Sequence, residues 1–170
     1  LNSLANQLNL DYDDGGKEAK KGKLIDDLYS ELEHIAFYKL KPPKSLGIEW
    51  VKENLQIIFK KYSDKPVEDL LFTYTTHSAN QIAKNLNNIS SVLVTGGGTY
   101  NSFLISKIRK RTNCEIIIPS TDIINYKEAI IFAFLSVLKI RGEVNCFASV
   151  TGSKHDHSSG KIFFPNPIID

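Results

Sequence analysis

Apolar residues recur at helical spacing in four segments of the first ninety positions. Apolar side chains three and four residues apart gather on one face of a helix, which is the pattern of an amphipathic helix. This pattern predicts helices over residues 1–10, 24–36, 49–62 and 67–86. Ser63 or Asp64 can cap the last of these, and Pro66 suits its first turn because an amide proton there would have no helical partner.

Each of these expected helices offers apolar side chains for burial. In the second and third helices they are Leu24, Leu28, Leu32, Ile35, Trp50, Leu55, Ile58 and Phe59. We interpret Trp50 as a core residue, since large apolar side chains are mostly buried on average. His77 stands alone in the fourth helix, and we interpret it as a packed or exposed residue rather than as a ligand.

The pattern changes after the fourth helix, where short β-branched or apolar runs alternate with helical segments. The short runs predict strands over residues 91–95, 115–119 and 162–164. A helix is expected over residues 101–111, and another over residues 128–141. The latter is apolar on nearly all sides, which predicts a buried helix, and Gly142 suits its C-terminal cap. Strands that alternate with helices predict an α/β architecture with at least some parallel sheet.

Composition excludes several classes of protein. The 170 residues suffice for one large domain or two small ones, and a net charge of +2 argues against a strongly basic nucleic-acid binder. No apolar run approaches the roughly 20 residues that a membrane helix needs. Two cysteines do not make a disulfide framework, so we expect free thiols in a reducing compartment. The sequence begins with leucine and contains no methionine, and we therefore expect a processed chain or part of a longer one.

The strongest candidate site is a run of three glycines, Gly96, Gly97 and Gly98, between an expected strand and an expected helix. Glycines let the main chain approach a ligand where a Cβ would clash, and the helix start offers unpaired amides to a phosphate. Asn101 can cap this helix or direct its amide at a ligand. The run matches neither G-x-G-x-x-G nor G-x-x-x-x-G-K-[ST], and a tight turn without a ligand would use the same glycines.

Three other segments are better explained by structure than by chemistry. Residues 41–49 contain two prolines and fit a stiff connector with Ser45 as a capping residue. His155 and His157 have the spacing of metal ligands on a strand, but no third ligand is evident, and an exposed loop explains them better. The basic run 107–111 fits a solvated helix end, where cations complement the helix dipole, better than a nucleic-acid contact.

Read together, five segments resemble the C-terminal half of the anhydro-N-acetylmuramic acid kinase family, in that family's order. They are Tyr12-Asp13 with Gly16, Ala19 and Gly22 (Y-D-x-x-G-x-x-A-x-x-G); Pro42–Gly47 with Glu49 (P-P-K-S-[TL]-G-x-E); Gly96–Gly98 with Asn101 (G-G-G-x-x-N); Glu128-Ala129 with Phe132-Ala133 (E-A-x-x-F-A); and Ser149–Gly152 (S-V-T-G). The chain departs from the family's usual residues at Gly15, Ile48 and Tyr100, which bears on substrate contacts more than on the fold.

The resemblance implies an α/β fold, the C-terminal domain of a sugar kinase/Hsp70/actin-like (ribonuclease H-like) fold with a mixed sheet flanked by helices. Residues 1–170 would form one domain or partial domain of a two-domain kinase, with a helical part over 1–90 and a nucleotide-binding part over 91–170. It implies a cytoplasmic enzyme of cell-wall recycling that uses ATP and Mg²⁺. Such an enzyme opens the 1,6-anhydro bridge of anhydro-N-acetylmuramic acid with water and phosphorylates O6.

The same resemblance assigns candidate residues. Gly96, Gly97, Gly98 and Asn101 would line the nucleotide cleft. Glu128 is a weaker candidate for the sugar side, and a carboxylate at a helix start explains it equally well. No catalytic residue and no metal ligand is assigned in this chain, because the catalytic base is expected upstream of Leu1. Expected partners are the sugar and ATP, with no nucleic acid, no membrane and a possible homodimer; the alternatives are another amino-sugar kinase or a non-catalytic nucleotide-binding module.

Overall fold

The computed structural model describes residues 1–41 and 44–163. The chain forms two compact units, Leu1–Asn125 and Tyr126–Asp170. We expected a helical part over 1–90 and a nucleotide-binding part over 91–170, because the type of element changes there. In the structure, the β–glycine turn–α–β segment packs with the preceding helices and belongs to the first unit.

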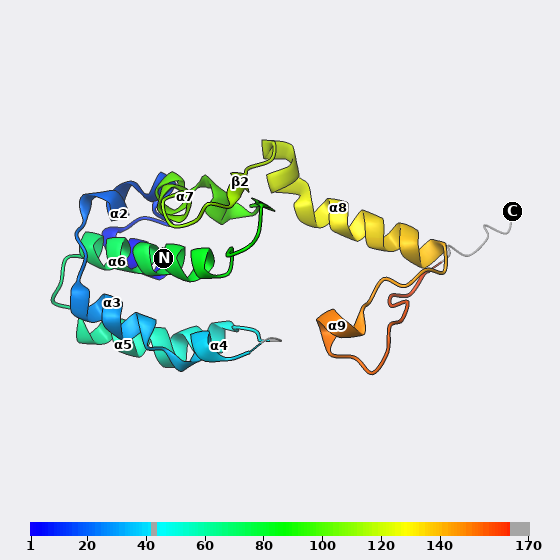
Figure 1. The fold of residues 1–170 in the computed structure, drawn as a ribbon, viewed down its shortest axis with the longest axis horizontal. Coiled ribbons are helices and arrows are strands. Elements are labelled where there is room, and N and C mark those ends of the chain that lie inside the picture. Colours follow the sequence, from blue (N-terminus) through cyan, green and yellow to red (C-terminus); the bar gives the residue numbers. More distant parts are fainter. Residues whose placement is uncertain (42–43, 164–170) are drawn as a thin grey trace, which may run out of the picture. The chain divides into compact units, whose positions relative to one another are not determined.

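A long helix, α6 (Val67–Lys84), runs through the first unit and contacts α2, α3 and α7 (Figure 1). The remaining helices of this unit are α1 (Asn2–Ala5), α2 (Lys17–Lys21), α3 (Asp26–Glu33), α4 (Ile48–Trp50), a π-helical turn (Val51–Leu55), α5 (Gln56–Lys61) and α7 (Ser102–Arg109). Short 3-10 turns occupy Asn6–Leu8, Asp14–Gly16, Ala36–Lys39 and Gly97–Tyr100. All four helices expected in the first ninety residues are thus present in shorter or interrupted form.

One apolar core joins α6 to the helices that precede it. Leu28 and Leu32 of α3 are fully buried, as are Leu71 of α6 and Ala19 of α2. The end of α2 approaches α6 so closely that a Cβ on Gly22 would lie 2.7 Å from the amide nitrogen of Asp69. Only a residue without a side chain fits there, because backbone atoms cannot move aside as a flexible side chain can.

A second apolar cluster joins α6 to the β–α–β segment. It consists of Ala79, Leu86, Ile105, Ile108, Cys114 and Ile116. The strands β1 (Ser91–Leu93) and β2 (Glu115–Ile117) pair in parallel, with Val92 opposite Ile116, and α7 forms the crossover between them. The α/β prediction is therefore confirmed. The sheet within the described residues is a two-stranded parallel one, not the mixed sheet that we expected.

A buried polar cluster lies between α3 and α6. His77 is 1% exposed, and its Nδ1 donates to Oε1 of Glu33 at 2.8 Å. Glu33 also accepts hydrogen bonds from the side chains of Asn80, Gln81 and Lys84. Burial lowers the pKa of His77, which keeps the ring neutral. His77 is thus a packed residue, as expected.

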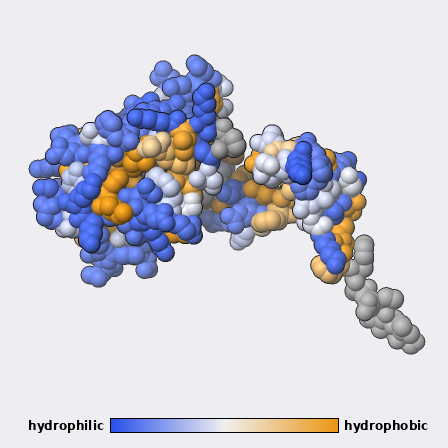
Figure 2. Space-filling model, turned by 90° about the horizontal axis from the view of Figure 1, so that it is seen from below, coloured by the Kyte–Doolittle hydropathy of each residue, from blue (hydrophilic) through white to orange (hydrophobic). Residues whose placement is uncertain are grey.

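The second unit contains most of α8 (Thr121–Ile140) and the short helix α9 (Ala148–Thr151). The prediction of a buried helix over 128–141 was wrong in two respects: α8 starts at Thr121, and apolar side chains such as Phe132 and Phe134 are exposed. The reason is that the residues packed on α8 within this unit form an irregular segment, held partly by the Lys139 Nζ hydrogen bond to the carbonyl of Ser158. Figure 2 shows apolar residues at the surface of both units.

Three smaller expectations need correction. The N-cap of α6 is Pro66, with no capping side chain, so neither Ser63 nor Asp64 caps it. Residues 162–163 form no strand, and residue 164 lies outside the described residues. The two prolines at 42–43, which we expected to form part of a stiff connector, also lie outside the described residues. Trp50 is half-buried against the core rather than fully enclosed.

Candidate functional site

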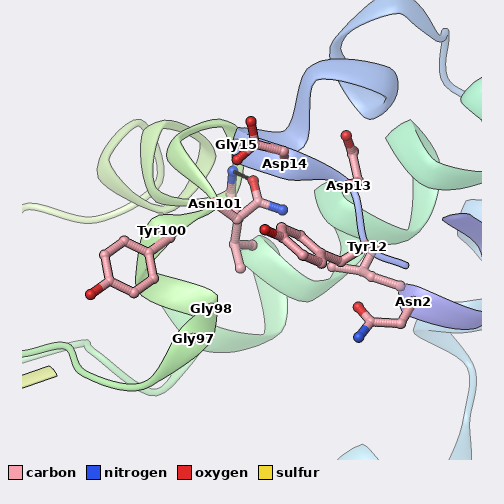
Figure 3. A pocket seen from close by; sticks show the side chains of 11 residues that line it. Asn2, Tyr12, Asp13, Asp14, Gly15, Gly97, Gly98, Tyr100 and Asn101 are labelled. Carbon is pink, nitrogen blue, oxygen red and sulfur yellow. Dashed lines mark hydrogen bonds between the residues drawn. The ribbon is translucent and has the colours of Figure 1, made fainter. Parts of the chain in front are cut away.

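A cavity of about 640 Å³ lies in the first unit, where two turns from distant parts of the sequence face one another (Figure 3). One is the glycine turn, Gly96–Asn101, which follows β1. The other is the acidic turn, Tyr12–Gly16, which precedes α2. The lining residues are Leu1, Asn2, Tyr12, Asp13, Asp14, Gly15, Gly97, Gly98, Tyr100, Asn101 and Leu104. This volume is within the range of small-molecule sites.

The glycine turn connects the sheet to the start of α7. Gly96 has a φ of +84°, in the left-handed region that favours glycine, and so it makes the turn possible. Asn101 is the N-cap of α7, and its side-chain oxygen accepts a hydrogen bond from the amide of Leu104 at 2.9 Å. The predicted cap is thus confirmed, and it uses only the oxygen of the Asn101 amide group.

Gly97 and Gly98 have a different character from Gly96. Neither has a positive φ, and a Cβ built on either would meet nothing within 4 Å. The fold of the chain therefore gives no steric reason for glycine at these two positions. Both residues line the cavity, and a bound ligand could approach the main chain closely there.

The carboxylate of Asp13 links the acidic turn to the start of α2. Asp13 is 7% exposed, and its two oxygens accept hydrogen bonds from the amides of Glu18 and Ala19 at 2.8 and 2.9 Å. Asp14 is exposed and pairs with Lys17 at 2.5 Å, and this hydrogen bond raises the pKa of Lys17. Both carboxylate oxygens of Asp13 therefore stabilise the start of α2, whereas Asp14 is exposed to solvent at the cavity wall.

Two contacts fasten the acidic turn to the start of α7. Ser102 Oγ donates a hydrogen bond to the carbonyl of Gly15 at 3.0 Å. Gly16 has a φ of +74°, and a Cβ there would lie 2.5 Å from the Cβ of Phe103 and would also clash with Oδ1 of Asn101. The cap of α7 and the acidic turn thus occupy one tightly packed junction beside the cavity.

The site residues expected from the sequence are brought together only in part. Gly97, Gly98 and Asn101 line the cavity, and Gly96 shapes the turn that carries two of them. Glu128 is exposed on α8 and belongs to the second unit. It lies in the third turn of α8, because the helix begins at Thr121, so its interpretation as a helix-start carboxylate was wrong.

Residues 12–15 of the acidic turn line the cavity but were not among the predicted site residues. Tyr12 and Asp13 were noted only as part of the family pattern, and Gly15 only as a departure from it. The paired glycines Gly15 and Gly16 were the available signal, since both adopt positive φ values. Nothing local in the sequence places this turn beside residues about 85 positions later.

The part of the chain that the structure describes contains neither a metal-binding cluster nor a membrane-spanning helix. Within residues 1–41 and 44–163, no group of three or more His, Cys, Asp or Glu side chains is arranged to hold a metal ion. His155 is exposed, and the backbone of His157 pairs with that of Cys146. In the same part of the chain, no helix combines the length and apolar character needed to cross a membrane.

Comparison with known proteins identifies the family. A family model described as anhydro-N-acetylmuramic acid kinase matches residues 2–165. The chain is 36% identical over 169 residues to the anhydro-N-acetylmuramic acid kinase of Francisella tularensis subsp. novicida, covering 92% of the chain and 44% of the relative. It is 33% identical over 171 residues to that of Bacillus cereus, with the same coverages. For that of Caldanaerobacter subterraneus the identity is 31% over 166 residues, covering 90% of the chain and 42% of the relative.

The chain belongs to the anhydro-N-acetylmuramic acid kinase family. It spans less than half the length of the curated relatives that it matches. The resemblance drawn from five sequence segments is thereby confirmed.

Proposed function

We propose that this chain is the nucleotide-binding, C-terminal portion of an ATP-dependent kinase. The complete enzyme would open the 1,6-anhydro bridge of anhydro-N-acetylmuramic acid with water and transfer the γ-phosphoryl group to O6. Family membership supports the reaction, and the cavity beside the glycine turn supports the nucleotide site. The proposal includes the sugar kinase/Hsp70/actin-like fold, of which this chain would contribute part of one domain.

The observation that carries the nucleotide assignment is the character of Gly97 and Gly98. A turn that served only to connect β1 to α7 would need glycine at Gly96, where φ is positive, but not at the next two positions. Glycine at those positions instead leaves the main chain accessible from the cavity. A phosphate bound there could approach the backbone amides before α7 and the positive end of its dipole.

The residues present fit a nucleotide better than they fit a metal ion alone. Asp13 has both carboxylate oxygens engaged by backbone amides, and Asp14 pairs with Lys17. Mg²⁺ usually binds through phosphates, waters and only one or two carboxylates, so it would enter with ATP and neutralise phosphate charge there. In this chain, Gly97, Gly98 and Asn101 would position the phosphates, and Glu128 would contact the sugar.

The remaining parts of the proposal concern the surroundings of the enzyme. We place the protein in the cytoplasm, where ATP is available, and the free thiols of Cys114 and Cys146 agree with a reducing compartment. The catalytic base would come from the part of the enzyme that precedes this chain. Formation of a homodimer is proposed as well, and size-exclusion chromatography with light scattering would test it.

A chimaera tests the function directly. Residues of the Francisella relative that match this chain are replaced by the chain, and transfer of ³²P from γ-labelled ATP to anhydro-N-acetylmuramic acid is measured. We expect the chimaera to phosphorylate this sugar in preference to N-acetylglucosamine and N-acetylmuramic acid. A chimaera that melts like its parent but transfers no phosphate to the anhydro-sugar would contradict the proposal, and a preference for another amino sugar would favour the alternative kinase.

A further inference from the structure

Two tyrosine rings line the cavity, and they differ in what holds them. The hydroxyl of Tyr100 donates a hydrogen bond to Oδ1 of Asn125 at 2.9 Å, and its ring points away from Tyr12 (Figure 3). The ring of Tyr12 extends from the acidic turn toward Asn101 and is 61% exposed. Tyr12 therefore presents a broad aromatic surface to the cavity, whereas Tyr100 is tied to the start of α8.

The backbone that carries Tyr12 is fixed at several nearby points. Asp13, the next residue, is anchored by two hydrogen bonds from α2, and the carbonyl of Gly15 accepts one from Ser102. Gly16 packs directly against Phe103, so the turn lies on the start of α7 with no space for a side chain between them. The backbone that carries the Tyr12 ring is thus held in place before a ligand binds. Less conformational entropy is then lost on binding.

The charges around the cavity favour one orientation of a bound nucleotide. The wall on the side of Tyr12 carries the carboxylate of Asp13 and the ion pair of Asp14 with Lys17, and the negative charge of Asp13 disfavours phosphate groups there. The opposite wall offers the glycine main chain and the start of α7, which favour anions. A nucleotide would therefore lie with its phosphates at the glycine turn and its uncharged base at the acidic turn.

We propose that Tyr12 stacks on the purine base of the nucleotide, and so determines the affinity of this site for a nucleoside phosphate over a phosphate chain alone. This assignment rests on the proposed function, because it takes the ligand to be ATP or ADP. An aromatic ring and a base both have extended π-faces, and stacking between them requires no particular hydrogen-bonding pattern.

The experiment compares two ligands on four variants of the chain by isothermal titration calorimetry: ADP and inorganic tripolyphosphate, each with Mg²⁺. The variants are Tyr12→Ala, Tyr12→Phe, Gly97→Val and Tyr126→Ala. Tyr126 is the matched control, since its side chain is exposed to a similar extent (63%) and it belongs to the second unit. Melting temperatures show that each variant is folded.

We expect Tyr12→Ala to weaken ADP binding by a factor of roughly 5 to 150, the range for loss of one base–aromatic stack. Tripolyphosphate binding should not change, and Tyr12→Phe should retain ADP affinity because its ring is kept. Tyr126→Ala should bind both ligands like the wild type. Gly97→Val should weaken binding of both ligands.

Three results would overturn the assignment, and they differ from failure of the proposed function. Unchanged ADP affinity in Tyr12→Ala, with binding lost in Gly97→Val, would leave the nucleotide site and remove Tyr12 from it. Equal losses for ADP and tripolyphosphate would mean that Tyr12 acts by supporting the turn. If Tyr12→Ala in the chimaera weakened binding of the anhydro-sugar and left ADP affinity unchanged, Tyr12 would contact the sugar and not the base. Failure of the chimaera that carries the unchanged chain to bind either ligand would count against the proposed function itself.

Discussion

Gly16 packs against Asn101 so closely that a side chain on Gly16 would collide with the oxygen that caps α7. The two residues are 85 positions apart in the sequence, yet they form one junction beside the cavity. The acidic turn therefore supports the helix start to which the glycine turn leads. A change at this junction should affect both the stability of the first unit and the shape of the site.

Gly16→Ala should destabilise the first unit by about 2–4 kcal/mol, because it combines backbone strain at positive φ with a steric clash. Gly15→Ala is the matched control: its φ is also positive, but its Cβ would meet only Ser102 Oγ at an ordinary 3.6 Å. The control should cost about 1–2 kcal/mol, from strain alone. Urea unfolding followed by circular dichroism measures both, and equal losses in the two variants would show that the contact with Asn101 contributes nothing.

Gly97→Val should weaken ATP binding about tenfold or more, equivalent to about 1.4 kcal/mol or more, while the chain stays folded. The reason is that the new side chain enters space that the protein does not use but a ligand would. Gly97→Ala should give a smaller loss, since it adds only one methyl group. Binding by calorimetry and melting temperature are measured on the same samples; wild-type ATP affinity in a folded Gly97→Val variant would remove the glycine turn from the nucleotide site.

Glu33 should make the free energy of unfolding of the first unit depend on pH in the acidic range. Burial raises the pKa of Glu33, but hydrogen bonds from Lys84, Asn80, His77 and Gln81 outweigh it and lower the pKa to about 2. A carboxyl group whose pKa is lower in the folded state contributes its full stabilisation of the fold above its unfolded-state pKa, here 4.5. This stabilisation is lost as the pH falls toward the folded-state pKa of about 2. Its size at neutral pH is on the order of 3 kcal/mol as an upper bound.

Urea unfolding of the wild type and Glu33→Gln between pH 2.5 and pH 7 tests this. We expect the free energies of unfolding to differ most above pH 5 and to converge toward pH 2.5. His77 acts in a separate window: its pKa is lowered by burial, so protonation of the unfolded state reduces stability as the pH falls below 6.5. His77→Gln should flatten the curve at pH values below the unfolded-state pKa of 6.5. Curves for the wild type and Glu33→Gln that stay parallel to pH 2.5 would refute the role of Glu33.

Glu128→Gln should lower turnover of the anhydro-sugar in the chimaera while ATP affinity is kept. Glu128 is exposed in the third turn of α8, so the structure requires no structural role for its charge. Glu143→Gln is a control at another exposed carboxylate of the second unit. Steady-state kinetics with both substrates separates the effects, and wild-type kinetics in Glu128→Gln would exclude a contact between Glu128 and the sugar.

Local signals in the sequence predicted most of the secondary structure and half of the site. Periodicity located α3, α6 and α7, because one face of each is buried in an apolar cluster. The strand, the glycines and the capping asparagine are adjacent in sequence, so the glycine turn could be identified without coordinates. The π-helical turn at Val51–Leu55 left no comparable signal, since its composition is that of an ordinary amphipathic helix.

The sequence by itself determined the α/β class, the glycine turn and the family, since each depends on residues close together in the chain or on their order along it. Only the tertiary structure decided that the acidic turn forms the opposite wall of the cavity, that Gly16 supports Asn101, and that His77 is buried against Glu33. It also decided that apolar residues of α8 are exposed. The physical reason is that burial and long-range contact depend on which surfaces meet, and periodicity along a single element does not specify its partner.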